Sequence, residues 1–317
     1  MKAQVEYDAK AVRLKARKKV WSDVWRDRQL YILIIPFLAY MLVFHYFPMY
    51  GLQIAFKDFS PFKGITGSDW VGLEHFKNFF SSPYAWRTIR NTLLINLYGL
   101  AWNFTLTIII ALLLNEIRHK KFKTLVSTVI YMPHFISVVV VAGIVIAILS
   151  PTSGVINQII SFFGGEKIYF LSKPEWFRTI FTAMNGWCQI GFGTIIYTSA
   201  ICSIDESLYE AAEMDGAGRF RKMWNVTLPG ISHVIVVQLI MKIGAMMTVG
   251  SDAILLLYQP ITYETADVIS TFVYRYGIEG GQYSFATAVG LFNGGIALIL
   301  VTLANKVSKK LNETSLW

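Results

Sequence analysis

The sequence is short of charge for its length. Asp, Glu, Lys and Arg make up only 15% of the 317 residues, whereas hydrophobic residues make up 54% and the mean hydropathy is +0.47. A soluble domain carries about 25% charged residues, so this deficit argues against a soluble protein and indicates that lipid surrounds the chain. Cysteine is scarce as well: Cys188 and Cys202 lie about four helical turns apart, too far to form a disulfide.

Three further absences exclude functions. No glycine stands in the G-x4-G-K-[S/T] pattern of a phosphate-binding loop, so we do not expect the chain to hydrolyse ATP itself. The five histidines lack the spacing of metal ligands, which disfavours a membrane-embedded metalloenzyme. The first 29 residues hold no apolar core, so no secretory signal peptide is expected. We therefore expect a non-catalytic membrane protein that binds no metal and no cofactor.

Six long apolar runs predict an all-α, polytopic fold with six transmembrane helices. Each run has about the 20 residues that a helix needs to cross about 30 Å of hydrocarbon. Unpaired peptide groups cannot lie in lipid, so these runs must be helical. The predicted spans are 30–50, 92–115, 125–149, 179–202, 234–257 and 285–305.

The distribution of basic residues predicts the orientation. An even number of spans places both termini on one side, and that side carries 19 Lys and Arg residues against nine on the other. The positive-inside rule therefore places both termini in the cytoplasm. The net charge of +9 is explained by this topology and by attraction to anionic lipid, so no nucleic-acid partner is expected.

This topology divides the chain into three predicted parts. Residues 1–29 form a basic cytoplasmic arm, 30–305 form the six-helix membrane domain, and 306–317 form a cytoplasmic tail.

The cytoplasmic segment 208–229 has the pattern of two short helices joined by glycine. Residues 208–215 are good helix formers, Gly216 and Gly218 end that helix, and 219–225 supply a second turn or two. Small side chains at Ala211 and Ala212 let another surface approach the backbone closely. A helix pair this short needs a partner for stability, so we expect it to lie in a partner's groove.

The same segment resembles the EAA loop of ABC-importer permeases. Glu210-Ala211-Ala212 is followed after three residues by Gly216, and after nine more by Val226, one residue, and Leu228-Pro229. The family pattern has isoleucine where this chain has Val226. The resemblance implies a type I ABC-importer permease fold and a contact with the ATPase through Glu210, Ala211, Ala212, Gly216, Arg219, Leu228 and Pro229.

Further stretches look like the carbohydrate-uptake branch of these permeases. They are 71–76, 90–92 and 132–137, while the basic arm and the first span look most like the subfamily for complex oligosaccharides and polysaccharide fragments. The resemblance implies a multi-pass protein of the bacterial plasma (inner) membrane. It also implies a second permease, two ATP-binding subunits that use ATP and Mg, an extracellular solute-binding protein and a carbohydrate substrate.

Polar side chains on the later spans are candidates for a translocation path. The fourth span has a stripe of Thr182, Asn185, Gly186, Gln189 and Gly193, and the fifth has Gln238, Lys242, Ala245, Val249 and Asp252. Ionisable groups inside a membrane usually face water, but small and polar stripes also pack helices together. The candidate path residues are Asn185, Gln189, Lys242, Asp252 and Asn293.

Two alternatives stay open at the level of sequence. An ABC-importer permease for a non-sugar solute would show the same coupling segment. An ion-coupled secondary transporter would need intramembrane carboxylates and commonly has inverted repeats, whereas this chain offers Asp252 and no evident repeat. The sequence names neither the sugar nor the subunit that holds it.

Overall fold

The structure is a computed structural model that describes residues 25–312. Residues 1–24 of the predicted basic arm and 313–317 of the predicted tail lie outside the described residues. The described chain is almost entirely helical, as predicted; its strands are β1 (Lys57–Asp58) and β2 (Asp69–Trp70), which pair antiparallel with Lys57 opposite Trp70. It forms two compact units, one comprising residues 25–54 with Ser60–Ser68 and the other Ala55–Phe59 with the chain from Asp69 onward.

The first unit consists mainly of one long apolar helix. It runs through α2 (Arg28–Met41), a π-helical segment η1 (Leu42–Tyr46) and most of a 3-10 segment η2 (Phe47–Phe56), and a single turn, α3, covers Gly64–Gly67. The stretch Arg28–Phe56 has a mean hydropathy of 2.0, and none of its most apolar window is buried. A helix that is apolar and uncovered on all sides suits lipid or a second membrane protein. It confirms the first predicted span.

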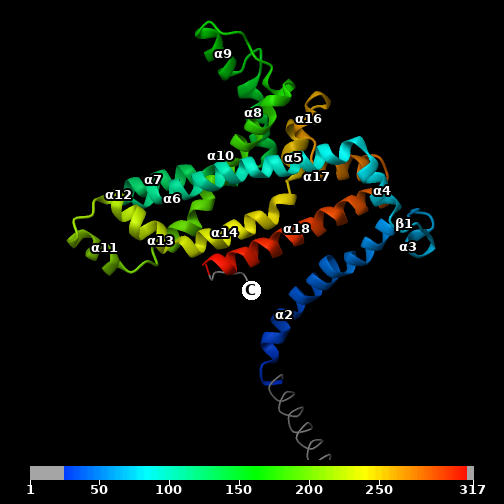
Figure 1. Cartoon of the computed structure of the whole chain (residues 1–317), viewed down its shortest axis with the longest axis horizontal. Helices are drawn as coiled ribbons and strands as arrows, with labels where there is room; N and C mark the ends of the chain where they lie inside the picture. Colours follow the sequence, from blue (N-terminus) through cyan, green and yellow to red (C-terminus); the bar gives the residue numbers. More distant parts are fainter. Residues whose placement is uncertain (1–24, 313–317) are drawn as a thin grey trace, which may run out of the picture. The chain divides into compact units, whose positions relative to one another are not determined.

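The second unit holds the other helices (Figure 1). They are α4 (Glu74–Ser81), α5 (Pro83–Gly99), η3 (Leu100–Phe104), α6 (Thr105–Asn115), α7 (Lys120–Tyr131), η4 (Met132–Phe135), α8 (Val138–Leu149), α9 (Val155–Phe162), η5 (Phe170–Ser172), α10 (Pro174–Ile201), α11 (Glu206–Met214), α12 (Arg219–Lys222), η6 (Met223–Thr227), α13 (Leu228–Gly230), α14 (Ser232–Gly244), η7 (Ala245–Met247), α15 (Ser251–Leu257), η8 (Pro260–Thr262), α16 (Tyr263–Ala266), α17 (Ile269–Val273), η9 (Tyr274–Glu279) and α18 (Tyr283–Asn312).

Two of the predicted spans are broken rather than continuous. The third, 125–149, bends by 100° between Phe135 and Val138, where Ile136 and Ser137 adopt extended backbone after Pro133. The fifth, 234–257, ends its first helix at Gly244 and restarts at Ser251 after an extended stretch at Thr248. The second and sixth are continuous over Pro83–Asn115 and Tyr283–Lys310. Counting each bent pair as one span gives up to six in the described residues, in agreement with the prediction.

Side chains from other helices satisfy the broken backbone. Near the break in the fifth span, Asn96 Nδ2 donates to the Met246 carbonyl at 2.7 Å, and Ser270 Oγ donates to the Val249 carbonyl at 2.9 Å. Irregular backbone is tolerated at membrane depth only where such partners exist or where it lines a cavity. The break is therefore a built feature of the fold.

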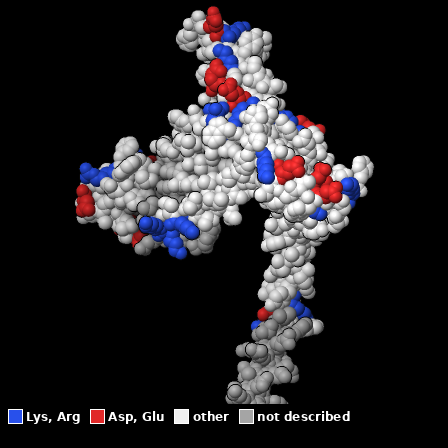
Figure 2. Space-filling model, turned by 45° about the vertical axis from the view of Figure 1, so that its right-hand side comes forward, with Lys and Arg blue, Asp and Glu red and all other residues white. Residues whose placement is uncertain are grey.

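Glycines let α10 pack closely against its neighbours, which include α6, α7 and α14. A methyl group on Gly191 would lie 2.0 Å from the carbonyl oxygen of Ile130 in α7, and one on Gly186 would lie 2.6 Å from Asn103 Oδ1. Small residues at such contacts allow the backbone approach that drives helix association in lipid. On the face shown in Figure 2, charged side chains gather toward the ends of the helices, and the surface between them is uncharged.

Gly191→Ala should destabilise the membrane domain. The added methyl meets a backbone carbonyl that cannot rotate away, and overpacking of this kind costs about 1–3 kcal/mol. The thermal midpoint of purified protein in detergent, followed by size-exclusion chromatography, should fall. Gly143→Ala in α8 is the matched control, because no atom lies within 4 Å of the added methyl. Equal midpoints for both variants would contradict the packing described here.

Candidate functional site

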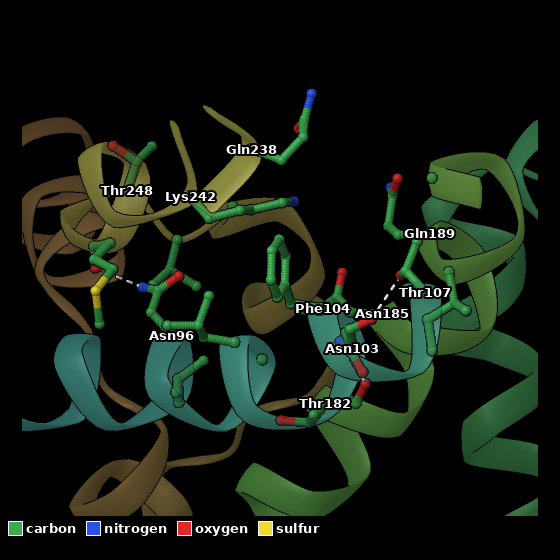
Figure 3. Close-up of a pocket in the computed structure, with 18 of the residues that line it drawn as sticks. Asn96, Asn103, Phe104, Thr107, Thr182, Asn185, Gln189, Gln238, Lys242 and Thr248 are labelled. Atoms are coloured by element: carbon green, nitrogen blue, oxygen red, sulfur yellow. Dashed lines mark hydrogen bonds between the residues drawn. The ribbon is translucent and has the colours of Figure 1, made fainter. Parts of the chain in front are cut away.

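A cavity of about 400 Å³ opens between three parts of the second unit (Figure 3). Its walls come from the α5–η3–α6 stretch, from α10, and from α14 with the broken segment that follows. The polar lining residues are Asn96, Asn103, Thr107, Thr182, Asn185, Gln189, Gln238, Lys242 and Thr248.

Several of these polar groups have no partner within the protein. Among the described residues, the side chains of Gln189, Gln238 and Lys242 make no hydrogen bond, and the buried Thr182 hydroxyl has none either. In Figure 3, Gln189 and Gln238 point away from the ribbons, and Lys242 extends from α14 toward the side of the cavity that carries Phe104. Unsatisfied donors and acceptors around a hollow are suited to a hydrogen-bonding solute.

Other polar groups hold the cavity walls together. Asn96 ties α5 to the Met246 carbonyl, and Asn103 Nδ2 donates to the Thr182 carbonyl of α10 at 3.2 Å. Asn185 bonds within its own helix, to the Phe181 carbonyl. The amides therefore divide into a structural set and a set that faces the hollow.

The lining is electrostatically one-sided. Among the described residues that line the cavity, Lys242 alone is charged, and none is a carboxylate. A solute there meets neutral amides, hydroxyls and one cation.

The structure brings three of the five predicted path residues together. Asn185, Gln189 and Lys242 line the cavity. Asp252 does not, because the chain turns after Thr248 and places it on the exposed first turn of α15, where Ser251 Oγ contacts it at 3.3 Å. Asn293 lies on α18, outside the lining.

Asn96 and Asn103 also line the cavity, although they were not predicted from the sequence. They stand seven residues apart in the second predicted span, which places them on one helix face. That spacing was the available signal.

The segment 208–229 forms a hinged pair of helices, as the sequence predicted. Asp205 caps α11 by accepting a hydrogen bond from the Ser207 backbone N–H at 2.9 Å, and this bond lowers the pKa of the Asp205 carboxyl. At the other end Gly216 has φ +71°, and the Ala217 N–H donates to the Ala212 carbonyl at 2.9 Å. This is a Schellman ending, and it needs the left-handed backbone that glycine adopts without strain.

We call the hinged pair of helices at 208–229 the hairpin. Two contacts fix the angle between its halves. The Tyr209 and Thr227 hydroxyls lie 2.9 Å apart, and Lys222 forms an ion pair with Glu213. The hydrogen bond from Lys222, and then its charge, lower the pKa of Glu213. None of these four residues was predicted from the sequence, because their pairing depends on how the hairpin folds back.

The outer surface of the hairpin is uncovered. Glu210, Ala211 and Arg219 are exposed, Ala212 and Leu228 are half-buried, and Pro229 is exposed. Apolar side chains stand beside them: Leu208 is 53% exposed, Phe220 81% and Trp224 68%. Exposed large apolar groups beside small residues mark a surface for a protein partner.

The helices, the central polar cavity and the hinged pair define a transport protein of the membrane. Residues 103–312 match the family described as "Binding-protein-dependent transport system inner membrane component". The chain belongs to this family and is a multi-pass inner-membrane component of such a system.

Similar proteins are known in bacteria. The polygalacturonan/rhamnogalacturonan transport system permease protein YteP of Bacillus subtilis (strain 168) is 45% identical over 98% of this chain and 97% of its own length. Protein LplB of the same organism is 44% identical over 92% of each chain. A solved chain of a bacterial ABC transporter involved in the import of the acidic polysaccharide alginate has a TM-score of 0.86 and 44% identity, covering 93% of this chain and 99% of that one.

Replacing Lys242 should alter transport without preventing assembly. Lys242→Met keeps an unbranched side chain, one atom shorter, but removes the one charge in the described cavity lining, so uptake by the assembled importer should fall about tenfold if the ammonium contacts the solute. The measurements are initial uptake rates and the yield of intact complex. Asp252→Asn is the control, since it removes a charge from the neighbouring α15 outside the cavity. Loss of the complex in Lys242→Met alone would assign Lys242 to helix packing instead.

Proposed function

We propose that this chain is one of two transmembrane permease subunits of an ATP-driven, binding-protein-dependent importer for oligosaccharides. The observation that carries the proposal is the cavity, which is lined by the unpartnered amides of Gln189 and Gln238 and by the Lys242 ammonium. Sugars present many hydroxyls, and each can exchange hydrogen bonds with such groups. Phe104, which is half-buried in the lining, adds a ring surface on which a sugar face can pack. The similar proteins named for polygalacturonan and alginate support a carbohydrate.

The coupling route follows from chain connectivity. Helix α10 carries Asn185 and Gln189 and continues after a 76° bend into α11. On the other side, the α12–α13 stretch continues after a 60° bend into α14, which carries Gln238 and Lys242. A displacement of the hairpin therefore moves α10 and α14, which form two walls of the cavity, at the same time. Such a lever can open the path toward one side while closing it toward the other.

The hairpin is the proposed docking surface for an ATP-binding subunit. Glu210 supplies a charge for a basic residue of that subunit, Ala211 and Ala212 allow close backbone approach, and Gly216 sets the bend. Arg219, Leu228 and Pro229 complete the segment. ATP and Mg would bind the two partner ATPases, and a second permease and an extracellular solute-binding protein would complete the importer.

Gly216→Val should uncouple the importer while leaving the membrane domain folded. A β-branched side chain is strained at φ +71°, and the left-handed backbone alone costs about 1–2 kcal/mol, so the end of α11 must rearrange. Either less ATPase should copurify with the variant, or cargo should no longer stimulate ATP hydrolysis above the basal rate.

Gly218→Val provides a matched control two residues away. Its backbone has φ −68°, which any residue adopts, and no atom lies within 4 Å of the added Cβ. It should retain cargo-stimulated hydrolysis. Wild-type coupling in both variants would show that the ATPase binds elsewhere.

A further inference from the structure

Four arginines gather at the end of the second unit that lies away from the hairpin. Arg87 and Arg90 come from the first two turns of α5, Arg178 from the second turn of α10, and Arg275 from η9. They surround the segment that joins α16 to α17, where Asp267 is 0% exposed. In the predicted orientation this is the outer end of the membrane domain.

Two of the four arginines, Arg87 and Arg275, donate hydrogen bonds to the Asp267 carboxylate. Its Oδ2 accepts from Arg87 Nη2 at 3.0 Å and from Arg275 Nη2 at 2.8 Å, and Thr271 Oγ1 donates to its Oδ1 at 3.0 Å. Both oxygens of the buried Asp267 carboxylate are therefore satisfied, and these bonds anchor the outer loops to α5.

Arg90 and Arg178 have no carboxylate of their own. Within residues 25–312 neither forms an ion pair, and their hydrogen bonds go to neutral acceptors. Arg90 Nη2 donates to the Glu264 backbone carbonyl at 3.2 Å, and Arg178 Nη2 donates to Asn91 Oδ1 at 2.9 Å. Asn91 in turn donates to the Glu264 and Asp267 carbonyls, so the site is rigid.

The four arginines carry more positive charge than the nearby carboxylates balance, and each has one donor atom without a hydrogen-bond partner. The Nε atoms of Arg87, Arg90 and Arg178 and the Nη1 atom of Arg275 are buried without a hydrogen-bond partner. Four guanidinium groups face one contacting carboxylate, Asp267, with Glu264 nearby. The cluster therefore carries excess positive charge, which a further anion would offset.

The cluster adjoins the cavity. Arg178, Thr182, Asn185 and Gln189 recur at four-, three- and four-residue intervals and so share one face of α10. The last three line the cavity, and on α5 Ile95 and Asn96 line it one turn after Asn91. An anion held at Arg90 and Arg178 would lie next to the outer end of a cavity that has Lys242 and no carboxylate in its described lining.

We propose that Arg90 and Arg178 form an anion-recognition site at the outer end of the path, which binds a carboxylate of an acidic, uronate-containing oligosaccharide. The inference rests on the proposed function and names its substrate class. A planar guanidinium pair matches the geometry of a carboxylate. Lys242 then offers a second cationic position deeper in the cavity.

The test compares an acidic sugar with its neutral form. A galacturonate oligosaccharide and its methyl ester are titrated into the complete importer in nanodiscs without the binding protein, and the dissociation constants are measured by calorimetry. The wild-type complex should bind the acid more tightly than the ester, and added salt should weaken only the binding of the acid. Arg90→Gln and Arg178→Gln should each weaken binding of the acid about tenfold and leave the ester unchanged.

Two control variants separate recognition from structure. Lys173→Gln removes a positive charge just before α10, outside the cluster, and should bind both sugars as the wild type does. Arg178→Lys keeps the charge and should recover most of the affinity for the acid. Equal wild-type affinity for acid and ester, or equal losses for both sugars in the glutamine variants, would overturn the proposal and assign both arginines to loop anchoring.

Failure of this inference can be told from failure of the proposed function. ATP-dependent uptake of the neutral ester without preference for the acid would overturn the anion site and leave the importer in place. Absence of ATP-dependent uptake of any oligosaccharide, neutral or acidic, would contradict the proposed function itself. If the glutamine variants do not assemble, equal affinity of the wild-type complex for acid and ester, or no effect of salt on binding of the acid, would still overturn the proposal.

Discussion

Peptide groups without partners cannot remain in hydrocarbon, and this constraint organises the membrane domain. Most of the chain meets it with regular helices, but the fifth span breaks after Gly244 and passes through extended backbone before α15. Asn96 and Ser270 supply hydrogen bonds to that stretch, and Met246, Thr248 and Val249 line the cavity. The break therefore forms part of the cavity wall, and Asn96, which stabilises the break, also lines the cavity.

The same chain geometry links the cavity to the hairpin. Helices α10 and α14 form two of its walls, and α11 to α13 joins their ends through a segment that the Schellman ending at Gly216, the Tyr209–Thr227 contact and the Glu213–Lys222 pair hold in shape. A stiff connection transmits displacement, whereas a flexible loop would absorb it. The close packing of α10 at Gly186 and Gly191 carries that displacement into η3 and α7.

Much of this was available from the sequence, and the remainder has physical reasons. Apolar run length predicted six spans, and the spacing around Glu210 and Gly216 predicted the hinged pair. Periodicity placed Asn185, Gln189 and Lys242 on polar stripes, and the structure brings them to one cavity. It could not separate them from Asp252, because a continuous helix was assumed where the chain breaks. The Asp267 triad is also invisible locally, since its members come from positions 87, 267 and 275.

In the proposed function, the cavity opens alternately to the two sides of the membrane under control of ATP. The direct measurement is the reactivity of Gln189→Cys, in a chain whose Cys188 and Cys202 are replaced by serine, toward a membrane-impermeant thiol reagent. Reagent is added to either side of the reconstituted importer, with and without ATP trapped on the ATPase. If the cavity alternates in this way, labelling from the two sides should change in opposite directions when ATP is trapped. Labelling from each side that is the same in both nucleotide states would contradict it.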